Sequence, residues 1–194
     1  MTAEEFNKYW NQHYPECPPI AHYLKLLYKD RWFRIRTLPE SKRYADTEQE
    51  YNEILHRHNT LLNDFIGDNG LFVLITAGYS DTAEPVRPEK ELLYLISSDK
   101  ELITIGIHEL EGEGEPNYWH LYFNEKHWTE HSLDDLLKMV ADDGIENVLL
   151  VGIEKKCLYH PYDGGADIVL ESGQLRDLMR EKYSSWLSIH PEGL

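Results

Sequence analysis

The sequence predicts an α+β fold, with a mainly antiparallel sheet of about six to eight strands and about four to five packing helices. Helical periodicity dominates the first third of the chain, and β-rich runs joined by short turns follow from Leu71 onward. Short connections between strands are typical of antiparallel pairing. The 194 residues contain no internal repeat, low-complexity tract or flexible linker, so we expect one domain over residues 1–194.

The N-terminal segment carries the signals of two helices. Thr2 and Glu5 form a capping box, and apolar residues at helical spacing extend the first helix to about Tyr14. Three prolines then end this helix, because proline cannot continue the helical hydrogen bonds. The range Ile20–Tyr28 suits one short helix, with a strand as the alternative.

A cluster of basic residues, the basic island, follows these helices. Trp32–Thr37 alternates apolar and basic residues, which predicts a half-buried strand with two arginines on one face. The loop Leu38–Tyr44 adds two more cations. The basic island consists of Arg34, Arg36, Lys42 and Arg43. It is a candidate site for a carboxylate or phosphate, and pairing with the surplus carboxylates of this chain is the alternative.

The longest predicted helix begins after this loop. Thr47 and Glu50 form a second capping box, and apolar residues recur at helical spacing as far as Phe65. Gly67 is a natural residue for the helix C-terminus. Two further helices are expected: one capped by Ser132, and an amphipathic one at the C-terminus. The apolar residues of the last helix are Leu175, Leu178, Met179, Tyr183 and Trp186.

The strands are predicted from short β-rich runs. The runs are Leu71–Ala77, Leu92–Ser97, Leu102–His108, Tyr118–Phe123, Asn147–Ile153, Leu158–His160 and Ile168–Leu170. Asp81–Glu89 is expected to be a surface loop, and the acidic, glycine-rich Glu109–Pro116 an exposed turn. The turn Tyr162–Asp167 contains two adjacent glycines, which we expect to be needed for a positive φ.

The net charge of −16 is concentrated in the second two-thirds of the chain. Residues 1–66 carry 9 Lys/Arg against 10 Asp/Glu, whereas residues 67–194 carry 10 against 25. Such a charge repels phosphate backbones, so we expect no binding to nucleic acid. It attracts a basic protein and speeds its association. The alternative is that the surplus acids serve solubility only.

The acidic candidates fall in two turns. The side chains proposed to contact a partner are Glu109, Glu111, Glu113, Glu115, Asp163 and Asp167. For the last two, the favoured interpretation is that the aspartates hydrogen-bond the backbone of their own turn. A contact with a partner or substrate is the second interpretation. The ligand spacing of a calcium loop is absent, so metal binding is the least favoured.

The sequence contains few signs of a cofactor or of catalysis. None of the HExxH, GxSxG, P-loop and GxGxxG motifs is present, and ten histidines show no metal-ligand spacing. We therefore expect neither a metal nor a cofactor. Cys17 and Cys157 form neither a disulfide framework nor a zinc pattern. No apolar run is long enough to cross a membrane and no secretory signal opens the chain, so we expect a cytoplasmic protein.

The stretch Leu158–Val169, with Tyr183 and Trp186 beyond it, contains a Tyr-Asp-x-Gly-x-Asp turn followed by a predicted helix that ends in Tyr and Trp. This pattern resembles the C-terminal signature of a bacterial family of domains of unknown function. Gly164 stands where relatives carry an arginine, and Trp32–Tyr44 is also similar to closer relatives. The resemblance implies an α+β domain, and it implies no activity, cofactor or catalytic residue.

Two functions follow as hypotheses. The first is a non-enzymatic cytoplasmic protein that binds a basic protein, in its sharpest form an immunity or antitoxin protein that covers the active site of a toxin. The second is an enzyme acting on a small molecule, with the basic island as an anion clamp and His120 or His160 as acid and base. The sequence favours the first, because recognised catalytic motifs are missing.

Overall fold

The computed structural model describes residues 1–86, 101–107 and 117–188. Within these ranges a seven-stranded sheet and five α-helices confirm the predicted α+β class. The strands are ordered β1-β7-β6-β5-β2-β4-β3, and each neighbouring pair is antiparallel. The strand bounds are β1 Trp32–Arg36, β2 Leu71–Ser80, β3 Glu101–Gly106, β4 Tyr118–His127, β5 Leu149–Gly152, β6 Cys157–Tyr162 and β7 Gly165–Val169. The predicted strand Leu92–Ser97 and turn Glu109–Pro116 lie outside the described residues.

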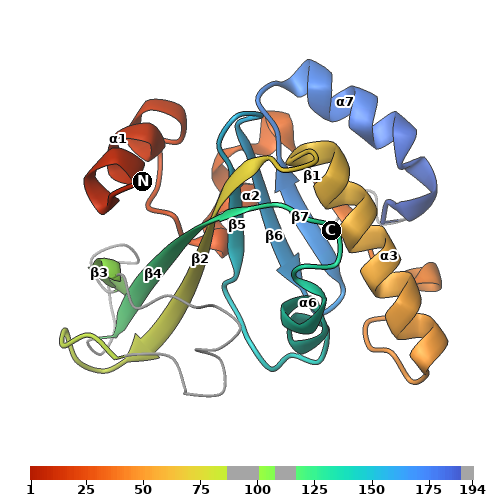
Figure 1. Cartoon of the computed structure of the whole chain (residues 1–194), viewed down its shortest axis with the longest axis horizontal. Helices are drawn as coiled ribbons and strands as arrows, with labels where there is room; N and C mark the ends of the chain where they lie inside the picture. Colours follow the sequence, from red (N-terminus) through yellow and green to blue (C-terminus); the bar gives the residue numbers. More distant parts are fainter. Residues whose placement is uncertain (87–100, 108–116, 189–194) are drawn as a thin grey trace.

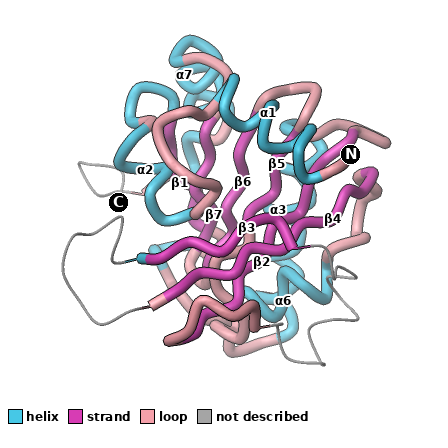
Figure 2. The backbone as a smooth tube through the Cα atoms, turned by 90° about the vertical axis from the view of Figure 1, so that its left-hand side faces the viewer, coloured by secondary structure: helices cyan, strands magenta, loops and turns pink. Residues whose placement is uncertain are grey.

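Helices cover both faces of this sheet (Figure 1). Their bounds are α1 Ala3–His13, α2 Leu24–Leu27, α3 Glu48–Phe65, α6 Asp134–Ala141 and α7 Gly173–Lys182. One apolar core joins the sheet to α3, α6 and the end of α7. A second core joins the opposite face to α1 and α2. The side of the sheet formed by β2, β4 and β3 faces the viewer in Figure 2.

Both predicted capping boxes are confirmed. Thr2 Oγ1 accepts from the Glu5 N–H at 3.2 Å, and the Glu5 carboxylate accepts from the Thr2 N–H at 2.7 Å. Thr47 and Glu50 make the same reciprocal pair at the start of α3. These signals are local, since each satisfies backbone N–H groups that the first helical turn leaves free.

The predicted cap of α6 is wrong. The N-cap is Leu133, which makes no side-chain cap, and Ser132 lies in the preceding turn, where its N–H bonds Thr129 O at 3.0 Å. His131 has a left-handed backbone with φ of 68°. This turn delays the start of the helix by one residue and directs Leu133 into the core, where it is 3% exposed.

The reason given for the glycines after Tyr162 is also wrong. Gly67 is the one glycine with a positive φ among the described residues. Gly165 already belongs to β7, where a Cβ atom would lie 1.9 Å from Ile35 O on β1. Glycine is therefore required at this position because two strands approach closely, and the turn itself is the short link Asp163-Gly164.

Candidate functional site

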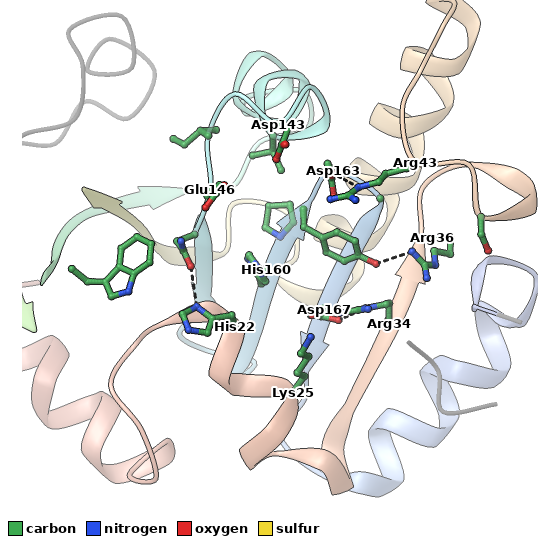
Figure 3. Close-up of a pocket in the computed structure, with 18 residues that line it drawn as sticks. His22, Lys25, Arg34, Arg36, Arg43, Asp143, Glu146, His160, Asp163 and Asp167 are labelled. Carbon is green, nitrogen blue, oxygen red and sulfur yellow. Dashed lines mark hydrogen bonds and ion pairs between the residues drawn. The ribbon is translucent and has the colours of Figure 1, made fainter. Parts of the chain in front are cut away.

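A pocket of about 590 Å³ lies on the α2 side of the sheet, over the ends of β1, β7 and β6 (Figure 3). Strand side chains alternate between faces, so Arg34 and Arg36 of β1 share this face, as predicted. Helix α2 covers the apolar end of the same face through Leu24. The pocket is lined by four basic and four acidic residues: Lys25, Arg34, Arg36, Arg43, Asp143, Glu146, Asp163 and Asp167.

Arg34 forms a largely buried ion pair with Asp167 across the β1–β7 pairing. Its Nε and Nη2 donate to the two carboxylate oxygens at 2.7 and 2.8 Å, and Trp32 Nε1 donates to the same carboxylate at 3.1 Å. The guanidinium also lies 4.8 Å from the ring centre of Tyr162. Burial alone would lower the pKa of Arg34, but the bonds to Asp167 outweigh it and raise the pKa. This arginine is therefore charged and already paired with a carboxylate.

The other members of the basic island do not all lie in the pocket. Arg43 Nε hydrogen-bonds Asp163, which raises the pKa of Arg43. Lys42 does not line the pocket, because its ammonium bonds Asp46 at 2.8 Å and also Glu50. Three of the four predicted anion-binding residues therefore meet in one pocket, and two of those three are already paired with carboxylates.

Arg36 is the arginine of the pocket that no described carboxylate pairs with. It makes no ion pair within the described residues, and its contact from Nη1 to the Tyr162 hydroxyl is long, at 3.5 Å. Its Nε is buried and has no hydrogen-bond partner. Lys25 of α2 also lacks an ion pair in the described part of the chain, and it lines the same pocket (Figure 3).

His160 supplies a basic nitrogen to the pocket. Its Nδ1 lies 2.9 Å from Val148 O. A carbonyl oxygen only accepts, so Nδ1 carries the proton and Nε2 bears the lone pair. Burial lowers the pKa of His160, and the bond to Val148 offsets part of this effect. The imidazole is therefore neutral near pH 7, and Nε2 has no hydrogen-bond partner among the described residues.

His120, the other predicted acid or base, is not in this pocket. It lies on β4 and is fully buried. Its two ring nitrogens lie 2.8 Å from Ser80 Oγ and 2.9 Å from Thr104 Oγ1, in the strands on either side. The prediction that His120 could act as acid or base beside the basic island is therefore wrong. The sheet places His120 outside the pocket that Arg34, Arg36 and Arg43 line.

The two aspartates of the β6–β7 hairpin have a different role from the one expected. Asp163 is 6% exposed and Asp167 is 5% exposed. Their carboxylates bond Arg43, Arg34 and Trp32, so the predicted bonds to their own turn backbone give way to long-range ion pairs. Their contact with a partner stays a prediction. The other acidic candidates, Glu109, Glu111, Glu113 and Glu115, lie outside the described residues.

The loop at the rim of the pocket is strained. Glu40 and Ser41 are consecutive non-glycine residues with φ of 55° and 58°. Such a conformation costs of order 1–3 kcal/mol for each residue and is concentrated at functional sites in proteins. Ser41 lines the pocket. The strain therefore lies beside the ion pair that Arg43 makes.

Metal and thiol chemistry receive no support from the described residues. No group of three or more His, Cys, Asp or Glu side chains in these ranges is placed to hold a metal ion. Burial raises the pKa of Cys17 to about 11 and that of Cys157 to about 12, so neither thiol is activated. No helix in the described part of the chain is long and apolar enough to cross a membrane.

Sequence reasoning missed half of the pocket. His22, Lys25, Trp119, Asp143 and Glu146 come from three segments that are distant in the chain. His22 Nδ1 lies 3.3 Å from Asn147 Oδ1. This contact links the turn directly before α2 to the residues directly before β5. None of these residues belongs to a motif, and only the pairing of the strands brings them together.

Comparisons with known proteins place the chain in a family. Neither the curated proteins nor the solved structures contain a match to this chain. A family model described as "Domain of unknown function (DUF3885)" matches residues 20–191. This range includes the whole sheet and every described residue of the pocket. The chain therefore belongs to this family of domains of unknown function.

Proposed function

We propose that this protein binds a small anionic molecule in the pocket over β1, β7 and β6, with Arg36 as its principal contact. The observation that carries the proposal is that Arg36 lacks both an ion pair and a partner for its Nε among the described residues. Its guanidinium lines the pocket, and its Nε is buried. Burying an N–H donor without a hydrogen-bond partner costs free energy. A bound carboxylate or phosphate is a strong acceptor for the N–H groups of the same guanidinium.

The surroundings of Arg36 support an anion over a cation at this point. Arg34 and Arg43 pair with Asp167 and Asp163, the two aspartates of the β6–β7 hairpin, so neither carboxylate competes for Arg36. Lys25 adds a second cation at the same side of the pocket (Figure 3). The volume of about 590 Å³ suits a small molecule.

His160 gives the bound molecule a proton acceptor. Its Nε2 is unprotonated at neutral pH, and its Nδ1 is held by Val148 O. A general base needs a lone pair within reach of the proton it removes and a pKa that leaves it neutral. If the protein is an enzyme, removal of a proton from the anionic molecule by His160 is the chemistry that this pocket offers.

Thermal unfolding with inorganic phosphate and with succinate tests the binding proposal. We expect each anion to raise the Tm in a saturable way, because a ligand that binds the folded state stabilises it by about 2.7 kcal/mol at one hundred times its Kd. Arg36→Gln removes the guanidinium and is expected to abolish the shift. Arg180→Gln is the matched control, since Arg180 is an exposed arginine outside the pocket.

The result that overturns the proposal is equally specific. If Arg36→Gln remains folded by circular dichroism and still responds to both anions as the wild type does, Arg36 is not the contact. If phosphate and succinate leave the wild-type Tm unchanged at tens of millimolar concentration, the pocket does not bind small anions.

A second proposal concerns a basic protein partner, such as a toxin that this chain would neutralise as an immunity or antitoxin protein. Its support is the net charge of −16, of which residues 67–194 carry −15. A field of this sign speeds association with a basic surface and weakens as salt screens it. A cytoplasmic location belongs to the same proposal and is supported by the two free cysteines, Cys17 and Cys157.

Affinity purification from the source organism at low salt, followed by reconstitution with the purified candidate, tests this second proposal. We expect a partner of high isoelectric point whose association rate falls by at least about tenfold between 50 and 500 mM NaCl. A partner that is acidic, or an association rate that does not depend on salt, would contradict the charge argument.

A further inference from the structure

The free charges of the pocket lie at two ends. Lys25 and Arg36 are on one side of the pocket, and Asp143 and Glu146 are on the other (Figure 3). None of the four makes an ion pair with another described residue, whereas Arg34, Arg43, Asp163 and Asp167 are paired with one another. The unpaired charge in the pocket is therefore of both signs and the two signs are separated, with the carboxylates of Asp143 and Glu146 exposed to solvent.

The acidic end continues into an aromatic corner. A second, smaller pocket of about 400 Å³ is lined by Ala77, Tyr79, Trp119 and Glu146, and so shares Trp119 and Glu146 with the first. Tyr79 and Trp119 pack edge to face with ring centres 5.4 Å apart. Tyr79 is 54% exposed, which leaves part of its ring in contact with solvent. A carboxylate beside exposed aromatic rings is a setting that attracts an organic cation.

We infer that the ligand of this pocket is a small zwitterion, whose anionic group meets Arg36 and whose ammonium or guanidinium group meets Glu146 and the ring of Trp119. This inference rests on the proposed anion binding at Arg36 and names the class of molecule bound. A simple anion satisfies Arg36 and leaves Glu146 without a counter-charge. A molecule with both groups satisfies the two ends at once.

The size of the pocket agrees with a molecule that spans it. Sites for small molecules commonly measure about 300–1,000 Å³ and hold their ligand by a few placed polar groups on a largely apolar wall. The lining of the pocket also includes uncharged groups, Pro161, Tyr162 and the neutral ring of His160. The expected ligand therefore has an uncharged segment between its anionic and cationic groups.

Isothermal titration calorimetry with matched probes tests the inference. The zwitterions 4-aminobutanoate, 6-aminohexanoate and 8-aminooctanoate vary the separation of the charges, and butanoate, hexanoate and octanoate lack the amine. We expect one zwitterion to bind about tenfold more tightly than its matched carboxylate, from one partly exposed ion pair together with one cation–π contact. Glu146→Gln should reduce that preference, because it removes the ion pair and leaves the contact with Trp119, and Arg36→Gln should weaken both probes.

Glu154→Gln is the control, because Glu154 is an exposed glutamate outside both pockets. The inference is overturned if every zwitterion binds no more tightly than its carboxylate while Arg36→Gln weakens both, a result that leaves anion binding intact. It is also overturned if Glu146→Gln leaves the preference for the zwitterion unchanged. If neither series binds and phosphate and succinate also fail to raise the Tm, the anion proposal itself is wrong.

Discussion

Asp167 is the residue on which the charge arrangement of the pocket depends. Its carboxylate accepts from Arg34 Nε, Arg34 Nη2 and Trp32 Nε1, and all three groups are largely removed from solvent. A buried arginine that loses its carboxylate keeps its charge, because guanidinium does not deprotonate in proteins. The pair therefore fixes β1 to β7 and keeps Arg34 from binding a ligand.

Asp167→Asn is expected to lower the free energy of unfolding by about 3 kcal/mol, the cost of leaving a buried charge unpaired. The change preserves the shape of the side chain, so the loss reports charge and not packing. Urea denaturation measures it. The double variant Arg34→Met, Asp167→Asn should recover part of the loss, and no recovery in the double variant would show that the pairing of charges is not its cause.

Residue patterns in the sequence predicted only part of this site. The alternation in Trp32–Arg36 correctly placed Arg34 and Arg36 on one face, since a strand has a period of two. The partner of Arg34 is 133 residues away in the chain, and no local pattern reports a register. Consequently the basic island appeared as four equivalent cations, although Arg36 alone of its three pocket arginines lacks an ion pair with a described residue.

At the level of elements, the β6–β7 hairpin packs against β1 so closely that one position excludes a side chain. Gly165 pairs with both Arg36 on β1 and Tyr162 on β6. A Cβ atom at this position would meet the backbone oxygen of Ile35 at 1.9 Å, which no rotamer change relieves. Gly164, its neighbour, would place a Cβ 3.2 Å from the ring of Tyr162, a side chain that is able to move.

Gly165→Ala is therefore expected to lower the unfolding free energy by at least about 3 kcal/mol, and Gly165→Val to prevent folding. Gly164→Ala is the matched control and should change stability by less than about 1 kcal/mol. Thermal denaturation of the purified variants separates these cases. Equal stability of Gly165→Ala and Gly164→Ala would contradict the close approach of β1 and β7.

Elements whose signals are local were predicted well. The capping boxes at Thr2 and Thr47 define the starts of α1 and α3, because the donors and acceptors lie three residues apart. The start of α6 was misplaced, since the left-handed residue His131 and the burial of Leu133 depend on tertiary packing. The same limit explains the Gly165 error: composition suggests a turn, and only the β1 backbone reveals the close contact.

Considered as a whole, the molecule buries ionisable groups that oppose folding in acid. His58 of α3 is fully buried and lies 2.6 Å from the Tyr159 hydroxyl. Burial lowers the pKa of His58 from 6.5 to about 4, and the pKa of His160 is lowered in the same direction. The unfolded chain therefore binds protons below pH 6.5 that the folded chain does not bind until about pH 4.

This difference predicts that stability is complete above pH 6.5 and falls progressively as the pH decreases toward 4. From His58 alone the loss between pH 7 and pH 5 is about 2 kcal/mol. Urea denaturation at the two pH values measures it in the wild type and in His58→Gln, which should lose about 2 kcal/mol less. His127→Gln, which removes an exposed histidine, should keep the wild-type dependence. An unchanged loss in His58→Gln would contradict the assignment.

The overall arrangement gives the pocket its place. The two apolar cores occupy opposite faces of one sheet, and α2 covers only part of its face, so the ends of β1, β7 and β6 remain available to line a pocket. The α+β class followed from the sequence because helix and strand periodicities are local. The pocket did not, because it is assembled by the order of strands from β1 to β5.

The most direct measurement of anion binding follows the side-chain Nε–Hε signals of the arginines by nitrogen-15 NMR during titration with inorganic phosphate. The signal of Arg36 is assigned by its disappearance in Arg36→Gln. We expect a saturable shift of the Arg36 signal and a stationary signal from Arg180 on the surface of α7. A stationary Arg36 signal, or equal shifts of Arg36 and Arg180, would contradict it.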